Sequence, residues 1–290
     1  MTMKKLGTFC KAHKAVTVYA ILVLLIILVA VFAKVIAPYS PTEASLRDAF
    51  QPPSAAHKFG TDFMGRDLFS RIIYGTRASL SSALILVAAA MVIGGLLGII
   101  AGFAGGVVDA VIMRVCDTML SFPDLILAIA IAGILGPSFV NAIIAILAVS
   151  WTKYARLARS MVLKIKQRDY IAAARTTGSR ARHILFTYMV PNALPTLLTT
   201  AVLDIGTTIL GISGLSFLGF GIQPPTPEWG YMLSEGRSYM QTYPWLMIFP
   251  GLAIFITVVA FNLLGDSVRD VLDPGKARKH KKKKRKLNKA

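Results

Sequence analysis

The chain has 290 residues, of which 55% are hydrophobic and 16% are charged, and its formal net charge is +18 at pH 7. A mean hydropathy of +0.62 is too high for an ordinary soluble domain, so the composition indicates an integral membrane protein. The two cysteines, Cys10 and Cys116, are too few and too far apart to define a disulfide framework or a metal cluster.

Long apolar runs predict the membrane spans. A helix needs about 20 apolar residues to cross roughly 30 Å of hydrocarbon. The first run carries one charge, Lys34, near its end. A cleavable signal peptide is the competing interpretation, which the length of the run and the lack of an A-x-A-like site disfavour. Six spans are predicted, at residues 15–36, 80–103, 116–135, 139–151 continuing toward 157, 196–220 and 245–264.

The distribution of basic residues predicts the orientation, because Lys and Arg in short loops favour the cytoplasmic side. Lysines without acidic residues precede the first span, whereas residues 37–79 carry five basic and four acidic side chains. Residues 153–195 carry nine Lys and Arg side chains against Asp169 alone, and the C-terminal tail is again basic. Six spans with both termini in the cytoplasm satisfy these biases.

The chain divides into three parts. We expect residues 1–79 to form an N-terminal cytoplasmic segment, the first span and an external loop. We expect residues 80–274 to form the core transmembrane permease domain and residues 275–290 to form a basic disordered cytoplasmic tail. A block of like charge is usually solvated, and directly after a span it is expected to contact anionic lipid headgroups. Nucleic-acid binding by the tail is disfavoured.

The external segment before the second span has a helical pattern. Leu68, Ile72 and Ile73 fall on one side of a helix, and Asp67 and Arg71 are one turn apart, so they can form an ion pair. We expect this helix to lie along the outer membrane surface. Whether it contacts a partner or caps the bundle stays open.

Glycines recur every four residues in and just after the second span, on one helix face. Small residues at this spacing let helices approach closely in lipid. The pattern predicts a packing seam, and the alternative is the generally higher glycine content of membrane helices. The residues are Gly94, Gly98, Gly102 and Gly106.

The stretch after the fourth span is polar and basic, yet has the pattern of two short helices. An alanine-rich helix is closed by Gly178, because glycine accepts a positive φ without steric cost. A second helical stretch at 179–189 leads to Pro191 and Pro195 at the start of the fifth span. The small side chains leave a smooth face that another protein can approach. This predicted docking element contains Asp169, Tyr170, Ala172, Ala173, Ala174, Gly178 and Pro191.

Asp204 is an acidic residue well inside the fifth predicted span, and ionisable groups in spans indicate functional sites. It is a candidate for the translocation pathway. The alternative is a residue near the helix start that reaches cytoplasmic water or a hydrogen bond within the bundle. In the following external turn, "QPPTPEW", Trp229 and Tyr231 suit the lipid headgroup zone.

Several motifs carry a family resemblance. They are the loop pattern Ala172-Ala173-Ala174, Gly178 and Tyr188-Met189-Val190-Pro191, together with "FGTDFMGRDLFSRIIYGTRASL", "SFPDLILAIAIAGILGPS", "LSFLGFGIQPPTPEWG" and "FPGLAIFITVVAFNLLGDSVRDVLDP". With these motifs nearly the whole chain resembles the permease subunits of ABC importers of the dipeptide, oligopeptide and nickel branch. Three loop side chains depart from the pattern: Ala172 replaces a glutamate, and Tyr188 and Val190 replace an aliphatic pair.

The resemblance implies an all-α integral membrane protein with six transmembrane helices of the type I ABC importer permease kind, and a cytoplasmic coupling helix between spans four and five. It implies a heterodimer with a second homologous permease subunit, two cytoplasmic ATP-binding subunits and an extracytoplasmic solute-binding protein, in a bacterial inner membrane. The chain has no G-x-x-x-x-G-K-[ST] motif. We therefore expect ATP to be bound by the partner subunits, and no cofactor, metal site or catalytic residue in this chain.

The cargo and two other functions stay open. Many peptide permeases of this branch carry a glutamate where this chain has Ile212, which favours nickel or metal-chelate cargo over di- or oligopeptides. An autonomous ion-coupled secondary transporter would need ionisable residues in several spans. An intramembrane enzyme would need a motif such as H-E-x-x-H or G-x-S-x-G, and the sequence contains neither.

Overall fold

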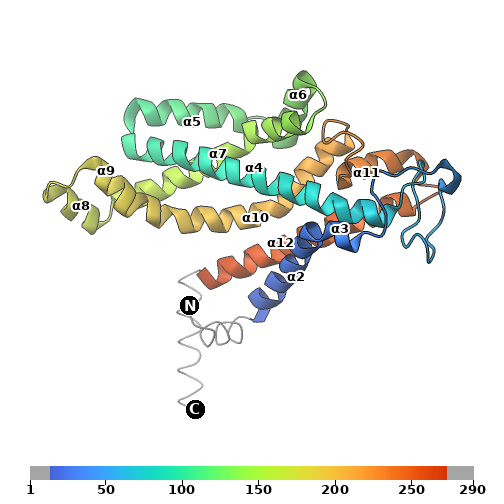
Figure 1. Ribbon diagram of the computed structural model, residues 1–290. Helices are drawn as coiled ribbons and strands as arrows, with labels where there is room; N and C mark the ends of the chain where they lie inside the picture. Colours follow the sequence, from blue (N-terminus) through green and yellow to red (C-terminus); the bar gives the residue numbers. More distant parts are fainter. Residues whose placement is uncertain (1–13, 273–290) are drawn as a thin grey trace, which may run out of the picture.

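The computed structural model describes residues 14–272, which form long helices joined by short connections (Figure 1). Within this range the isolated pairing of Thr61 with Asp67 is the sole β bridge. The lysine-rich tail and the lysines before residue 14 lie outside the described residues. The helices are α2 (Lys14–Val31), α3 (Ala33–Ile36), η1 (Leu46–Asp48), α4 (Leu68–Ala104), α5 (Gly106–Leu120), α6 (Asp124–Leu135), α7 (Phe139–Lys166), α8 (Asp169–Thr176), α9 (Ala181–Ile184), η2 (Leu185–Met189), α10 (Val190–Phe217), α11 (Trp229–Gly236), η3 (Arg237–Tyr239) and α12 (Trp245–Leu272).

Four helical runs in the described part of the chain are long and apolar enough to cross a membrane: α2, α4, the run from α9 through α10, and α12. The pair α5 and α6 makes a fifth crossing if the two helices count as one span. Many leucine and isoleucine side chains of α2 are exposed, as expected for a helix that faces lipid. The structure thus supports a helical membrane protein.

The third predicted span is two helices. α5 and α6 meet at an angle of 91°, with the break at residues 121–123. Pro123 lacks an N–H donor and disfavours helical backbone at the preceding residue, so the helix ends before it and a new one begins after it. The apolar run at 116–135 hid this break, because it contains the end of α5 as well as all of α6.

The helix that contains the fourth predicted span extends beyond it, and α7 as a whole is not among the runs that are long and apolar enough to cross a membrane. α7 continues to Lys166, so Lys153 and the basic residues after it lie on a helix and not in a loop. Carboxylates of α5 pair with two of them: Arg159 Nη2 donates to Asp109 Oδ2 at 2.6 Å, and Arg156 pairs with Asp117. Because these charges are paired across two helices, they do not end α7.

The predicted external surface helix is the first part of α4. Asp67 is the N-cap residue of α4, and its Oδ2 accepts a hydrogen bond from the Ser70 N–H at 2.7 Å. Its other oxygen lies 2.9 Å from His57 Nδ1. The one-turn spacing predicted an ion pair between Asp67 and Arg71, and this prediction is wrong. The Asp67 carboxylate is held instead by the free backbone N–H groups at the start of its own helix.

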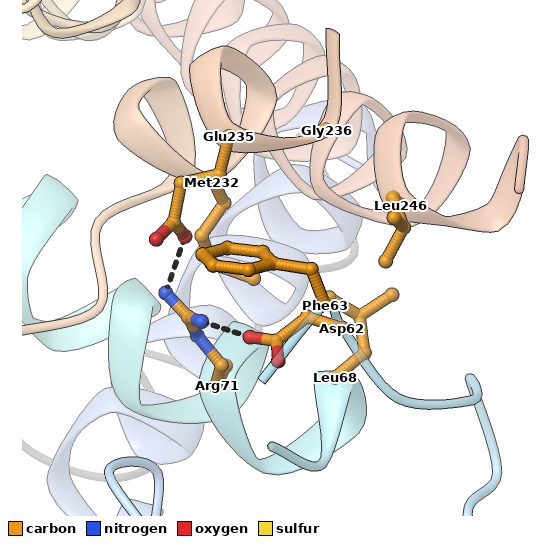
Figure 2. A pocket seen from close by; sticks show the side chains of 8 residues that line it. All are labelled: Asp62, Phe63, Leu68, Arg71, Met232, Glu235, Gly236 and Leu246. Carbon is orange, nitrogen blue, oxygen red and sulfur yellow. Dashed lines mark hydrogen bonds and ion pairs between the residues drawn. The ribbon is translucent and has the colours of Figure 1, made fainter. Parts of the chain in front are cut away.

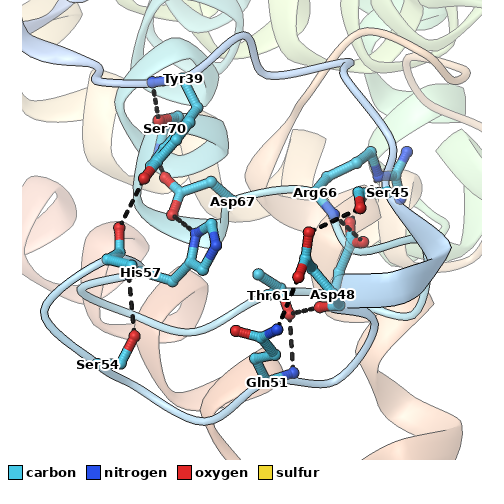
Figure 3. Close-up of polar contacts among 12 residues, drawn as sticks. Tyr39, Ser45, Asp48, Gln51, Ser54, His57, Thr61, Arg66, Asp67 and Ser70 are labelled. Carbon is cyan, nitrogen blue, oxygen red and sulfur yellow. Dashed lines mark hydrogen bonds and ion pairs between the residues drawn. The ribbon is translucent and has the colours of Figure 1, made fainter.

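Residues 37–67 cover one end of the bundle, and their polar contacts are shown in Figure 3. The Thr61 hydroxyl accepts a hydrogen bond from the Gln51 N–H at 2.8 Å, and Asp48 accepts one from the Gln51 side chain at 2.8 Å. Aromatic stacking of Phe59 on Phe249, with ring centroids 4.1 Å apart, attaches this segment to α12. The segment is an ordered cap.

The fifth predicted span begins earlier than expected. α9, the π-helical turn η2 and α10 form one run from residue 181 to 217, so Pro191 and Pro195 lie inside it and not ahead of it. A π turn widens the backbone hydrogen-bond ladder. It stands just before Pro191, where the ladder lacks an N–H donor in any case.

Three of the four predicted seam glycines lie against α7. A Cβ atom at Gly94 would stand 2.1 Å from the Trp151 carbonyl oxygen, and one at Gly98 would stand 2.1 Å from that of Ala155. A Cβ atom at Gly102 would stand 2.9 Å from the Val162 Cβ atom. Gly106 is not part of this contact. α4 ends at Ala104, before Gly105, whose φ is +68°, and Gly106 starts α5 with nothing within 4 Å of its Cβ position.

Candidate functional site

A cavity of about 320 Å³ lies between α4, α6, α7 and α10. This is at the lower end of the range for small-molecule sites, about 300–1,000 Å³. Its walls are mainly apolar, with Leu86, Val87 and Ala90 from α4 and Ile146 and Val149 from α7. The polar lining comes from Asp124, Ser150, Lys153, Tyr154, Asp204, Thr207 and Thr208. An apolar cavity with a few convergent polar groups is the usual form of a ligand site.

Asp204 is the centre of the polar lining. Lys153 Nζ lies 2.6 Å from Asp204 Oδ2, and the Tyr154 hydroxyl donates to the same oxygen at 2.7 Å. Tyr154 is 1% exposed, while the side chain of Asp204 is 14% exposed and that of Lys153 is 52% exposed. Tyr154 therefore fixes Asp204, and Lys153 reaches it from the open side.

Both charged partners lie halfway along their helices, α7 and α10. The sequence placed Asp204 well inside the fifth predicted span, as a candidate for the pathway, with a hydrogen bond within the bundle as part of the alternative. In the structure Asp204 both lines the cavity and accepts a hydrogen bond within the bundle. Sequence reasoning missed Lys153 as a lining residue, because Lys153 was assigned to a cytoplasmic loop. The one indication in the sequence was that Lys153 follows the apolar run that begins at Phe139 without a glycine or proline to end the helix.

The docking segment lies at another place, the end of the bundle where α8 and α9 project (Figure 1). α8 closes in a glycine turn: Gly178 has φ of +79°, the Ser179 N–H donates to the Ala174 carbonyl, and the Gly178 N–H donates to the Arg175 carbonyl. These two bonds form the Schellman arrangement. The turn fixes the direction in which the chain leaves α8.

The two faces of α8 differ. Ile171 and Ala174 are buried against the bundle, while Ala172 and Ala173 are exposed. Tyr170 is also exposed, and its ring lies 5.8 Å from that of Tyr188. Asp169 and Pro191 are exposed as well. The outer face of α8 thus has small side chains beside an aromatic pair.

An ion cluster at the opposite end of the bundle was not predicted. It consists of Asp62, Arg66, Arg71 and Glu235, and Figure 2 shows Arg71 between the two carboxylates. Arg66 Nε lies 2.6 Å from Asp62 Oδ2, and Arg71 Nη2 lies 2.7 Å from Glu235 Oε2. The Arg71 side chain is 2% exposed. The cluster joins residues 37–67 and α4 to α11, a contact between segments too far apart in sequence for spacing rules to find.

A second buried contact joins α11 to α4. Glu228 is fully buried, and its carboxylate accepts hydrogen bonds from the Ser79 hydroxyl at 3.1 Å and from the Tyr231 N–H at 2.9 Å. Trp229 is 2% exposed, and its indole N–H donates to the Ile72 carbonyl at 3.0 Å. The expected headgroup position of Trp229 is therefore wrong, because the ring packs on Gly75 inside the bundle.

Within residues 14–272 the structure contains no group of three His, Cys, Asp or Glu side chains placed to hold a metal ion. Cys116 is buried in α5. The charged groups that line the cavity are one lysine and two carboxylates, Asp204 and Asp124.

Long apolar helices around a mainly apolar cavity with a charged pair in its wall are typical of a multi-pass membrane protein of the transport class. The chain belongs to the family of inner membrane components of binding-protein-dependent transport systems, the permease subunits of ABC importers: residues 94–278 match the family described as "Binding-protein-dependent transport system inner membrane component". Residues 10–53 match the "N-terminal TM domain of oligopeptide transport permease C". The resemblance seen in the motifs is confirmed, and with it a location in the inner membrane.

Relatives with different cargo names are similar to this chain to nearly the same degree. It is 44% identical to the dipeptide transport system permease protein of Alkalihalophilus pseudofirmus, over 91% of this chain and 87% of that protein. It is 44% identical to the glutathione transport system permease protein of Pectobacterium atrosepticum, over 92% and 88%. It is 40% identical to the nickel transport system permease protein of Escherichia coli K12, over 94% and 98%. Overall similarity therefore does not select one cargo.

Proposed function

We propose that this chain forms half of the translocation pathway of an ATP-driven importer, and that it receives the motion of the ATPases through α8. One observation carries the proposal. α8 lies between α7 and the run that becomes α10, and both of these helices line the cavity. A rigid displacement of α8 is therefore transmitted to two walls of the cavity.

The proposal includes six crossings: α2, α4, the α5–α6 pair, α7, α10 and α12. The short basic segments around α8 then lie in the cytoplasm. Figure 1 supports this arrangement, because α8 and α9 are at one end of the long helices while α11 and residues 37–67 are at the other. With an even number of crossings, both termini are cytoplasmic.

The partners are those that membership of the family implies. Two cytoplasmic subunits bind and hydrolyse ATP, and this chain holds no cofactor of its own. A homologous permease subunit completes the pathway as a heterodimer, and an extracytoplasmic solute-binding protein delivers cargo to the end that carries α11. The cargo is a small polar solute of the short-peptide or metal-chelate class. Ile212, which favoured metal chelates, is 4% exposed in the core and does not line the cavity.

Cysteine cross-linking tests the role of α8. In a background without native cysteines, a cysteine at Ala173 is expected to cross-link to an ATPase subunit, with a yield that changes severalfold between nucleotide-free and ATP-bound complexes. The physical reason is that the exposed face of α8 moves with its partner. The matched control is a cysteine at Leu46, which is 79% exposed at the other end of the molecule and should give no such product. Equal yields from both positions, or no product from Ala173, would contradict the proposal.

The charged pair inside the bundle is the one observation that favours a second function, an autonomous ion-coupled transporter. Uptake into vesicles separates the two. The ATP-driven function requires that uptake stops when ATP is removed and continues when ion gradients are collapsed. The opposite pattern would assign the coupling to the pair of Lys153 and Asp204.

A further inference from the structure

We propose that Lys153 and Asp204 form a bipolar binding site for a zwitterionic cargo, a short peptide with a free ammonium and a free carboxylate, and that this pair sets the charge selectivity of the pathway. The inference rests on the proposed function, because it assigns the cargo-binding groups of the same cavity. It selects one of the two cargo classes left open above.

The two charges differ in freedom. Asp204 is held by the buried Tyr154 hydroxyl at 2.7 Å and is 14% exposed. Lys153 is 52% exposed and extends into the cavity from a flexible side chain. Asp204 is therefore a fixed negative pole, and Lys153 is a positive pole that can move away from it to contact another anion.

Exchange of partners explains why a zwitterion fits. When the cargo ammonium takes the place of Lys153 on Asp204, Lys153 is released and pairs with the cargo carboxylate. One ion pair is lost and two are gained, so no charge in the cavity is left without a partner. This matters because an uncompensated charge in a largely apolar site is costly.

Other charge types leave a group unpaired. A cation alone satisfies Asp204 but leaves Lys153 beside a like charge, and an anion alone satisfies Lys153 but leaves Asp204 without a cation. Asp124, at the start of α6, adds a second carboxylate to the lining. The site therefore favours a cargo that carries at least one positive group in addition to its carboxylate.

The rest of the cavity fits a short peptide. A volume of about 320 Å³ admits a small molecule. Apart from the charged pair, the walls offer mainly aliphatic groups such as Leu86 and Ile146. Such walls contact the apolar parts of the cargo with little selectivity, whereas the charged pair responds to every ammonium and carboxylate group of the cargo, at its termini and in its side chains.

Other ion pairs of the same bundle provide a control. Asp117 of α5 pairs with Arg156 of α7, and both side chains are about half exposed. Neither residue lines the cavity. Asp117→Asn removes the same charge from the same bundle as Asp204→Asn, without changing the cavity.

The test measures initial uptake rates in proteoliposomes that contain the complete importer, with both permease subunits, both ATPases and the binding protein. The probes are radiolabelled L-alanyl-L-lysine and L-alanyl-L-glutamate, and the measured quantity is the ratio of their rates. Because each permease variant receives cargo from the same binding protein, the preference of that protein cancels when variants are compared. Subunit co-purification and basal ATP hydrolysis monitor assembly.

Asp204→Asn should lower the ratio of lysine-peptide to glutamate-peptide uptake about tenfold, which corresponds to about 1.4 kcal/mol. Lys153→Met should raise the ratio to a similar extent, and Asp117→Asn should leave it unchanged. Should Asp204→Asn fail to assemble, Lys153→Met tests the opposite shift by itself, since its side chain is half exposed.

Three results would overturn the inference. A structural role of the pair predicts that both peptides slow equally, so that the ratio is constant in the variants. ATP-dependent uptake of a nickel chelate without uptake of either peptide would overturn the zwitterion site and leave the importer function intact. A wild-type complex without ATP-dependent uptake of any of these probes would overturn both.

Discussion

Replacement of Arg71 by leucine is expected to destabilise the folded protein by about 3–5 kcal/mol, the usual cost of removing one partner from a buried ion pair. Arg71 is 2% exposed and bridges Asp62 and Glu235. Without it, two carboxylates lie close together away from water, with Arg66 as the remaining cation of the cluster. Thermal unfolding of the purified protein in detergent measures the effect.

The matched control is Arg156→Leu. Arg156 also pairs with an aspartate, Asp117, but their side chains are 49% and 54% exposed. An exposed pair contributes about 0–1 kcal/mol, so this variant should unfold close to the wild-type temperature. Equal shifts for Arg71→Leu and Arg156→Leu would mean that burial of the ion cluster does not determine its energetic role.

The second large effect is expected for Gly98→Ala. The added methyl group would stand 2.1 Å from the Ala155 carbonyl oxygen and 2.8 Å from its Cα, both backbone atoms of α7. A backbone cannot move aside as the end of a side chain can, so α4 and α7 must separate. Overpacking of this kind costs about 1–3 kcal/mol, and occasionally more. The midpoint of thermal unfolding should fall by several degrees.

Gly214→Ala provides the comparison. Gly214 is also a helical glycine, in α10, but nothing lies within 4 Å of its Cβ position. Alanine there should stabilise the helix by about 0.5–1 kcal/mol, because it loses less conformational freedom on folding. Opposite signs for the two substitutions would show that close helix contact, and not glycine as such, determines the result. A neutral Gly98→Ala would contradict the α4–α7 seam.

Much of the fold follows from apolar runs, because the length of hydrocarbon to be crossed is fixed. The runs at α2, α4 and α12 were located from hydropathy. The predictions of helix ends fail where a helix is stabilised by contacts with residues that are distant in the sequence. α7 was ended too early because the acidic residues that neutralise Arg156 and Arg159 come from α5, about 40 to 50 residues earlier. The break at Pro123 was hidden because the apolar run at 116–135 continues across it.

The residues of the candidate site also differ in whether the sequence alone could identify them. Asp204 was identified because an ionisable residue in a span is conspicuous by itself. Lys153 and Tyr154 were not, since their roles depend on the contact of α7 with α10. The docking role of Ala172 and Ala173 stays a prediction: the structure describes their exposure, and the partner that would contact them is a separate chain. The number of membrane crossings and the identity of the cargo also stay predictions, because they concern the contacts of this chain with lipid and with solute.

The π turn at Leu185–Met189 determines where α8 points. Successive residues of an α-helix are rotated by about 100° around its axis, so one residue more or fewer in this turn would rotate the segment directly before it, α8 and α9, by that angle relative to α10. Deletion of a single residue between 185 and 189 would leave the cavity lining of α10 unchanged and swing Ala172 and Ala173 toward a different side of the bundle. The orientation of the exposed face of α8 relative to the cavity-lining face of α10 therefore depends more on the number of residues in this turn than on their side chains.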